Sequence, residues 1–320
     1  MLALALGLIS NASLATDERR ASITQNFYNL ELWDNHAYGN KIKTILANTY
    51  AAQKFGSEIV NNSKWITDEI KHAWTQGHTG EGVSINVVDN HRKYTRTRAS
   101  HGASVKAVAG GKINIRGTKT IGIAPDADVT RTHMAGNTIF RSNTYDYDIV
   151  NFSFVSDHGI DVATHRPTNY FRNVQTDALI VKGAGNRENN CKLDGKCSAY
   201  NLELTSNHLS DQTLIVGAVH SKTGNRYGTK AGILKDNFVV DDSFYTINAN
   251  NWIGGTSSAT PTVAGKAAII KSKFPNLNGA GLANLIKTTA DDLGAPGVDE
   301  IYGHGKVNLT RALSPVGTIR

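Results

Sequence analysis

The chain has 320 residues, 40% of them hydrophobic, and a formal net charge of +7. This length and composition allow one large domain or two modest ones with a sizeable core, and they exclude a disordered chain. After residue 16, no apolar run reaches the roughly 18 residues of a membrane-spanning helix, so we expect no transmembrane segment. No nucleic-acid-binding motif accompanies the positive charge, so we expect no nucleic-acid partner.

The amino-terminal residues differ in character from the rest of the chain. Residues 1–16 are largely apolar, with a small-x-small pattern near Ala15, which predicts a secretory signal peptide and hence a periplasmic or extracellular protein. The segment lacks the usual basic start, and a buried helix is the alternative. Residues 17–62 are polar and aromatic, with one expected helix at 41–55. Two interpretations of this extension stay open, a propeptide remnant and a structural arm that wraps the following domain.

Short apolar strands followed by glycine turns recur along the remaining chain, with helix-like stretches between several of them. The expected strands lie at 84–88, 149–154, 179–181 and 214–218. This alternation predicts an α/β fold with a doubly wound, mainly parallel sheet flanked by helices. We expect this domain to cover residues 63–313, with a carboxyl-terminal tail at 314–320.

The first expected strand ends in Asp89, and open parallel sheets place their functional sites at the carboxyl ends of strands. Twelve residues later, His101 is followed by Gly102 and by a run of small residues, 107–111, that is compatible with a tightly packed helix. Each residue also has an ordinary explanation, since an aspartate can cap a turn and a single histidine can lie at the surface. Taken in order, they are a candidate general base and its orienting carboxylate.

Ser257 lies between the Gly254-Gly255 pair and an apolar run, 263–270, that predicts a buried helix. Serine is a poor nucleophile unless a base, itself oriented by a third group, accepts its proton. The chain order Asp, His, Ser is the order of subtilisin and differs from the Ser, Asp, His order of α/β-hydrolases. We therefore predict a catalytic triad of Asp89, His101 and Ser257 that requires no cofactor.

These motifs resemble those of the subtilisin-like serine proteases, the subtilase family, over roughly residues 65–313. A Gly-Glu-Gly-Val turn precedes the Asp89 strand, and His101-Gly102-Ala103 stands where the family has His-Gly-Thr. The serine motif Gly-Thr-Ser-Ser-Ala-Thr-Pro departs from the family only at Ser258, where methionine is usual. The resemblance implies an exported serine endopeptidase that acts on a protein or peptide substrate.

The resemblance also implies roles for two further segments. The stretch 181–186 resembles the family's strand that ends in the oxyanion asparagine, so Asn186 would stabilise the oxyanion together with the backbone N–H of Ser257. An asparagine after a glycine is otherwise typical of a left-handed turn. The family binds substrate by adding a strand, so two extended edges would flank the bound peptide. These edges are Ser153 and Phe154 on one side and Gly183, Ala184 and Gly185 on the other.

Departures from the family leave several properties open. The connection from Asp89 to His101 is shorter than usual, so calcium ligands cannot be carried over, and a structural calcium ion stays open without assignable ligands. We predict no metal in the catalytic site. Val155 and Ser156 replace glycines beside the substrate, which leaves the shape of the cleft and the specificity open.

Three other functions are alternatives to a protease. A catalytically silent subtilase fold used for binding is the main alternative, and the intact triad argues against it. An α/β-hydrolase would need a second glycine after the nucleophile, where this chain has Ala259. A dinucleotide-dependent oxidoreductase would need a third glycine at position 188, where this chain has Glu188.

Two further features bear on stability and partners. Cys191 and Cys197 lie close together in a chain expected to be exported, which favours a disulfide over a metal site because no second Cys/His pair accompanies them. From residue 91 to residue 120 the chain has eight basic residues and no acidic one. Such runs are usually solvated surface, but here the run surrounds His101 in sequence, so an acidic substrate is a hypothesis. The eight are Arg92, Lys93, Arg96, Arg98, Lys106, Lys112, Arg116 and Lys119.

Overall fold

The computed structural model describes residues 37–91, 99–115, 117–133, 146–154, 159–161, 170–187, 191, 196–220 and 222–316. The expected signal peptide at 1–16, the extension up to residue 36 and the last four residues of the expected tail lie outside the described residues, so these predictions stay untested by the structure.

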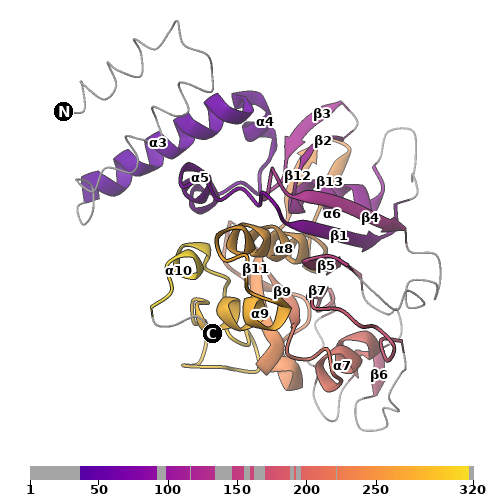
Figure 1. Cartoon of the computed structure of the whole chain (residues 1–320). Coiled ribbons are helices and arrows are strands. Elements are labelled where there is room, and N and C mark those ends of the chain that lie inside the picture. The colour runs from indigo at the N-terminus through magenta and orange to yellow at the C-terminus, as the bar shows by residue number, and fades with distance from the viewer. Residues whose placement is uncertain are drawn as a thin grey trace, which may run out of the picture.

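The elements follow one another as strands and helices along the whole described chain (Figure 1). The helices are α3 (Ala37–Phe55), α4 (Ser57–Asn62), α5 (Asp68–Thr75), α6 (His101–Ala109), α7 (Ala199–Ser206), the 3-10 helix η4 (Gly232–Asn237), α8 (Thr256–Lys273), α9 (Gly279–Thr288) and α10 (Leu309–Leu313). The strands are β1 (Ser84–Asp89), β2 (Lys112–Ile115), β3 (Thr118–Ile121), β4 (Asp128–His133), β5 (Ile149–Phe152), β6 (Gly159–Asp161), β7 (Leu179–Gly183), β8 (Lys196–Ser198), β9 (Thr213–His220), β10 (Arg226–Tyr227), β11 (Phe238–Ser243), β12 (Tyr245–Asn248) and β13 (Asn251–Ile253).

The central sheet is parallel over six strands in the order β4-β1-β5-β7-β9-β11. The short strand β10 pairs antiparallel with the end of β9, which makes seven strands in all. The register places Ile85 of β1 beside Ile149 of β5, and Ile149 beside Leu179 of β7. The predicted mainly parallel sheet is therefore confirmed, and the carboxyl ends of its six parallel strands meet at one edge.

Both faces of the sheet are buried, because alternate residues of each strand point to opposite sides. Leu179 and Val181 of β7 belong to the large core that includes the residues of α6, α8 and α9, whereas Ile180 belongs to a second core on the other face with Leu204 of α7. In Figure 1, α8 lies along the middle of the sheet and α7 lies on the far side of β7. This arrangement of helices on both faces is the doubly wound architecture that the sequence predicts.

Three differences between the expected and the observed limits of elements bear on the site. The strand expected at 149–154 ends at Phe152, because Ser153 and Phe154 leave the sheet at its edge. The helix expected after His101 begins at His101 itself, where the Ser100 hydroxyl accepts a hydrogen bond from the backbone N–H of Ala103 and so caps the helix. The helix expected at 263–270 begins seven residues earlier, at Thr256, and places Ser257 in its first turn.

The helix expected at 41–55 is α3, and its end is part of the main core. Tyr50, Ala51 and Phe55 are buried in the same cluster as Trp65 and Trp74. The rings of Phe55 and Trp74 meet edge to face with centroids 4.9 Å apart. Figure 1 shows the start of α3 projecting away from the sheet, while its end and α4 lie against the body of the molecule.

Candidate active site

The predicted site residues lie at the edge where the parallel strands end. Asp89 is the last residue of β1, Ser153 follows β5, and Asn186 lies three residues beyond β7. Since β1, β5 and β7 are neighbours in the sheet, the topology brings these three positions to one place. This is where open α/β sheets bind their ligands.

Asp89 and His101 form a direct side-chain contact. The Nδ1 atom of His101 lies 2.7 Å from Oδ1 of Asp89, whose side chain is only 2% exposed, whereas that of His101 is 40% exposed. Burial lowers the pKa of His101, but the hydrogen bond to Asp89 and the negative charge of its carboxylate outweigh burial and raise the pKa above its ordinary value. The carboxylate therefore fixes the orientation of the ring, and the contact leaves Nε2 as the nitrogen available to the cleft.

Gly102 is required beside the imidazole because His91 occupies the space that a side chain would need. A Cβ atom at Gly102 would lie 2.5 Å from the ring of His91. The backbone N–H of Gly102 also donates to the carbonyl of Asn90, at 2.9 Å. The His-Gly pair in the sequence thus reflects close packing between the end of β1 and the start of α6.

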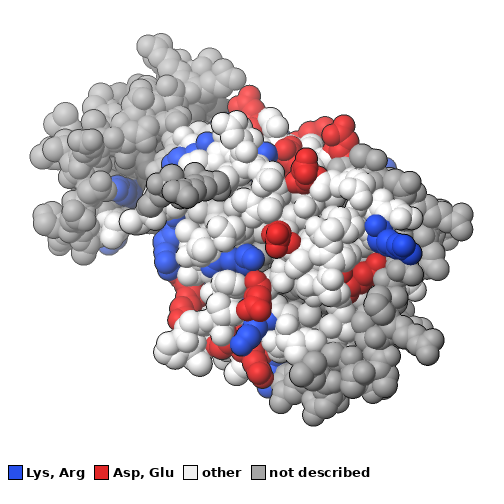
Figure 2. Space-filling model, turned by 60° about the horizontal axis from the view of Figure 1, so that its bottom comes forward, with Lys and Arg blue, Asp and Glu red and all other residues white. Residues whose placement is uncertain are grey.

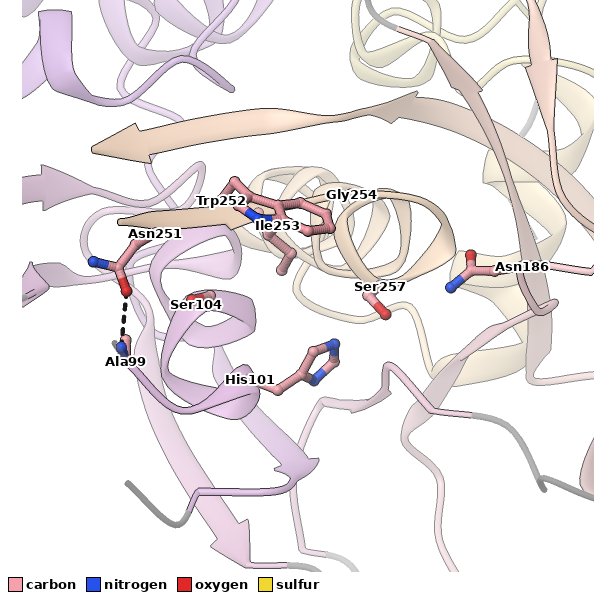
Figure 3. A pocket seen from close by; sticks show the side chains of 9 residues that line it. All are labelled: Ala99, His101, Ser104, Asn186, Asn251, Trp252, Ile253, Gly254 and Ser257. Carbon is pink, nitrogen blue, oxygen red and sulfur yellow. Dashed lines mark hydrogen bonds between the residues drawn. The ribbon is translucent and has the colours of Figure 1, made fainter. Parts of the chain in front are cut away.

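Ser257 is presented by a tight turn at the start of α8. Gly255 has a φ of 64°, and a Cβ atom there would lie 2.3 Å from Oδ1 of Asn186, so only glycine fits. The Ser257 hydroxyl donates to the carbonyl of Ser153, at 3.3 Å, rather than to His101. Ser257 and His101 nevertheless face the same cleft (Figure 3). Catalytic hydrogen bonds of this kind commonly tighten only when the substrate binds.

The amide of Asn186 is held by the first residue of α8. Its Oδ1 accepts hydrogen bonds from the backbone N–H of Thr256, at 2.9 Å, and from the Thr256 hydroxyl, at 3.1 Å. Figure 3 shows the amide nitrogen on the side that faces Ser257. The backbone N–H of Ser257 is in the first turn of a helix, where N–H groups have no intrahelical acceptor. Two donors therefore lie close to the candidate nucleophile.

Backbone hydrogen bonding within the protein decides how each of the two segments expected to flank a peptide could contact it. Most of the second segment is already paired within the protein: Ala184 donates to Val216, and the carbonyl of Gly185 accepts from Thr229. Gly183 belongs to an interior strand of the sheet rather than to an edge. This segment can line a bound peptide as a wall, but it offers no free ladder of hydrogen bonds, in contrast to the expectation of two extended edges.

Lys182 is a functional candidate that sequence reasoning missed. Its side chain is completely buried, and its Nζ donates to the carbonyls of Phe154 and Gly183, the latter at 3.1 Å. Burial lowers its pKa to about 7. The Nζ atom of Lys182 joins the two segments that flank the site. A lysine that directly follows the apolar run 179–181 was the available signal, because lysine is rarely buried without a role.

A cleft of about 380 Å³ opens beside these residues (Figure 3). Trp252 is a second residue that the sequence analysis did not single out, and it is 61% exposed at this cleft. The lining residues are Ala99, His101, Ser104, Asn186, Asn251, Trp252, Ile253, Gly254 and Ser257. Candidate nucleophile, base and oxyanion donor thus share one cavity.

The two cysteines are bonded to each other, and the described residues contain no cluster of metal ligands. Cys191 and Cys197 are joined in a disulfide with Cα atoms 4.7 Å apart, which confirms that expectation. Within the described ranges, no group of three or more His, Cys, Asp or Glu side chains is arranged to hold a metal ion. The same part of the chain contains no helix long and apolar enough to cross a membrane.

The basic run from residue 91 to residue 120 is only partly described. Lys106, Lys112 and Lys119 lie in the described part, and none of the three lines the cleft. The Nζ of Lys112 lies 5.5 Å from the ring centre of Phe55, beside α3. The remaining five basic residues lie outside the described residues. On the face shown in Figure 2, basic and acidic side chains are interspersed. A preference for acidic substrates therefore stays a hypothesis.

Comparison with known proteins identifies the family to which this chain belongs. The model of the subtilase family matches residues 58–305. Subtilisin DY from Bacillus licheniformis is 23% identical over 267 residues, which cover 74% of this chain and 93% of that protein. An extracellular serine protease from Serratia marcescens is 45% identical over 60 residues, but this match covers only 19% of this chain and 6% of that relative.

Solved structures agree with the fold. The crystal structure of MycP1 from Mycobacterium smegmatis superposes with a TM-score of 0.56 and 19% sequence identity, over 80% of this chain and 86% of that one. At this identity the likeness establishes the fold alone.

Proposed function

Because this chain belongs to the subtilase family of serine proteases, we propose that it is an endopeptidase in which Ser257 attacks the peptide carbonyl, His101 transfers the proton and Asp89 orients the imidazole. One observation carries the proposal: His101, held by Asp89 at 2.7 Å, lines the same cleft as Ser257. A carboxylate, an imidazole and a hydroxyl in this order are the parts of an acyl-transfer site.

The chemistry follows from the position of each group. Asp89 occupies Nδ1 of His101, so Nε2 accepts the proton when the Ser257 hydroxyl rotates away from the Ser153 carbonyl and attacks the substrate. The same nitrogen then returns the proton to the leaving amine. Hydrolysis of the acyl-enzyme repeats these steps with water as the nucleophile. His101 is thus the general base and the general acid in turn.

The attacked carbonyl oxygen becomes negatively charged and needs hydrogen-bond donors at that moment. The side-chain nitrogen of Asn186 and the backbone N–H of Ser257 supply them, because the amide oxygen of Asn186 is already bound by Thr256. Preorganised donors of this kind stabilise the transition state without further reorganisation. Asn186 therefore acts on turnover rather than on substrate affinity.

The acyl part of the substrate lies between Ser153 and Phe154 on one side and the wall formed by residues 183–185 on the other. The side chain of Lys182 joins these two segments by donating to the carbonyls of Phe154 and Gly183. An extended peptide fits such a channel, so protein or peptide substrates are the class that this site accepts.

Labelling of Ser257 by a fluorophosphonate tests this function. Purified protein is treated with the probe and the modified residue is identified by mass spectrometry, while hydrolysis of a denatured protein is followed in parallel. We expect modification at Ser257 and loss of both labelling and hydrolysis in Ser257→Ala, with a drop in turnover of about 10⁶, the loss known for the corresponding serine of subtilisin rather than a value derived for this chain.

Ser272→Ala is the matched control, since Ser272 lies at the other end of the same helix and donates only to the carbonyl of Ile269. This variant should label and hydrolyse normally. A folded wild type that neither labels nor hydrolyses would support the alternative, a catalytically silent subtilase fold used for binding.

Export belongs to the same proposal. The disulfide between Cys191 and Cys197 is a bond that persists in oxidising compartments, and one relative carries the name extracellular serine protease. We expect the protein in the periplasm or the medium, with no reactive thiol. Cell fractionation followed by alkylation under denaturing conditions checks this, and two alkylated cysteines in exported protein would contradict it.

A further inference from the structure

The cleft beside His101 is bounded by two separate parts of the fold. The start of α6 forms one side through Ala99, His101 and Ser104, and strand β13 forms the other through Asn251, Trp252 and Ile253. Figure 3 shows the ring of Trp252 above the cleft and the imidazole of His101 below it. The cavity of about 380 Å³ is large enough for an amino-acid side chain.

Trp252 is held at the rim of this cleft by a fixed hairpin. Strands β12 and β13 pair antiparallel, and their residues Tyr245 and Ile253 are buried. Asn251 ties the hairpin to the start of α6, because its Oδ1 accepts from the backbone N–H of Ala99, at 2.8 Å. Within this hairpin the Trp252 ring is 61% exposed, the largest exposed fraction of any tryptophan in the described residues. Tryptophan is enriched at binding interfaces, because its ring offers a large apolar surface for contact.

The direction of the chemistry decides which part of a substrate lies in this cleft. His101 must give its proton to the leaving amine, so the residue that follows the scissile bond lies beside the imidazole. The carbonyl oxygen points instead to Asn186, and the acyl part lies toward Ser153. The cleft between α6 and β13 is therefore on the leaving-group side of Ser257.

The chemistry of the cleft walls selects the kind of residue that binds there. Trp252, Ile253 and Ala99 supply apolar surface, and His101 is the only titratable side chain among the lining residues. Among the described lining residues, no side chain other than His101 could pair with a charged group, whereas an apolar or aromatic side chain would bury its surface against the indole ring.

We propose that Trp252 makes this protease select an apolar or aromatic residue immediately after the scissile bond. The inference rests on the proposed function, since it assigns a specificity to the leaving-group side of the same site. It concerns Trp252 as a specificity residue and not as part of the catalytic machinery.

Transfer of the acyl group to an added amine measures this preference separately from the acylation of Ser257, because the amine reacts only with the acyl-enzyme. The enzyme is acylated with a peptide ester, and the ratio of aminolysis to hydrolysis is measured with leucinamide, phenylalaninamide, glycinamide and aspartic acid α-amide as acceptors. We expect leucinamide and phenylalaninamide to react about tenfold better than glycinamide, because apolar pockets discriminate by about this factor per side chain, and the acidic acceptor to react least.

Two variants of Trp252 assign the preference to this residue. Trp252→Ala should reduce the tenfold preference to about twofold or less while ester hydrolysis continues, and Trp252→Phe should retain most of it. Ile45→Ala is the control, since Ile45 is also an exposed apolar side chain, 42% exposed, but lies on α3 away from the cleft. Active-site titration with the fluorophosphonate normalises every variant to its folded fraction.

The outcomes separate this inference from the proposed function. Normal ester hydrolysis with equal use of all acceptors overturns the inference and leaves the protease function standing. An apolar preference that persists in Trp252→Ala also overturns it. If Trp252→Ala fails to fold, Trp252→Glu replaces it and should favour argininamide over leucinamide. A wild type without ester hydrolysis overturns the protease function, and the inference with it.

Discussion

His101 is subject to two opposing influences on its pKa. Burial alone would lower it, and Asp89 raises it by a larger amount, so the pKa lies above the ordinary value of 6.5. A general base must be neutral to accept a proton, so the enzyme is inactive below this pKa and becomes active as the pH rises through it. We predict that the acid limb of the kcat/KM profile has its midpoint above pH 6.5.

Asp89→Asn provides the matched test of this pH dependence. The variant removes the charge that raises the pKa and leaves the burial, so the midpoint of the acid limb should move to lower pH while turnover falls by about 10⁴. An acid limb that does not move when Asp89 is replaced would contradict the assignment of the limb to His101.

Asn186 tests the oxyanion site at the level of one side chain. We predict that Asn186→Ala lowers kcat by about 10²–10³ with little change in KM, because the lost hydrogen bond forms fully only in the transition state. The magnitude is that of subtilisin's own oxyanion asparagine. Steady-state kinetics on a peptide amide checks this, with the exposed Asn284→Ala on α9 as the control. A change confined to KM would show that Asn186 only positions the substrate.

Helix α8 carries the candidate nucleophile at its start and a buried ionic network in its middle. The Nζ of Lys266 lies 3.0 Å from Oδ2 of Asp241 on β11 and 3.5 Å from Oε2 of Glu69 on α5. It also donates to the carbonyl of Val307, at 3.1 Å. Burial lowers the pKa of Lys266, but the charges of Asp241 and Glu69 raise it above its ordinary range, so the lysine is charged. Helix α8, strand β11, helix α5 and the segment before α10 are therefore all joined through the ammonium group of Lys266.

We predict that Lys266→Met lowers the free energy of unfolding by about 3–5 kcal/mol, because it leaves the fully buried carboxylate of Asp241 without its partner. The double variant Lys266→Met/Asp241→Leu should recover most of this loss, since apolar side chains can replace a buried ion pair. Urea unfolding followed by circular dichroism measures both variants. Equal instability of the single and the double variant would mean that the network is not what stabilises this region.

At the scale of the whole molecule, the helices before the sheet are joined to the catalytic body. Phe55 is 5% exposed and packs against Trp74 of α5, and the side chain of Asn62 donates to the carbonyl of Lys119, at 3.1 Å. On these contacts we propose that the described part of the extension is a structural arm rather than a propeptide remnant. A removable segment would be expected to cover the cleft rather than to complete the core.

We predict that Phe55→Ala lowers the stability of the whole protein by about 3–5 kcal/mol, the usual cost of deleting a buried aromatic ring. Activity and far-ultraviolet circular dichroism should be lost in one transition on heating. Ile45→Ala, at an exposed position of the same helix, should have little effect. A partial loss of the helical circular dichroism signal at a temperature where activity persists would instead indicate a separable propeptide.

The order of Asp89, His101 and Ser257, the glycines around them and the alternation of apolar strands with helices could all be predicted from the sequence. These features are local: an apolar run predicts a buried strand wherever it occurs, and a glycine is required wherever the chain turns with positive φ, as at Gly255. The disulfide and the family followed from similarly short motifs, and both are confirmed.

Only the tertiary structure decided which surfaces face the reacting groups. Nothing near Lys182 in the sequence shows that its Nζ atom contacts the carbonyl of Phe154, 28 residues earlier in the chain. Trp252 stands in a short strand whose place beside α6 depends on the hydrogen bond from Ala99 to Asn251, 152 residues away. Contacts between residues so far apart are set by how the strands order themselves in the sheet and by the packing of helices on its two faces. The chemistry of the site is therefore encoded locally, whereas the shape of the cleft and its specificity depend on packing across the whole domain.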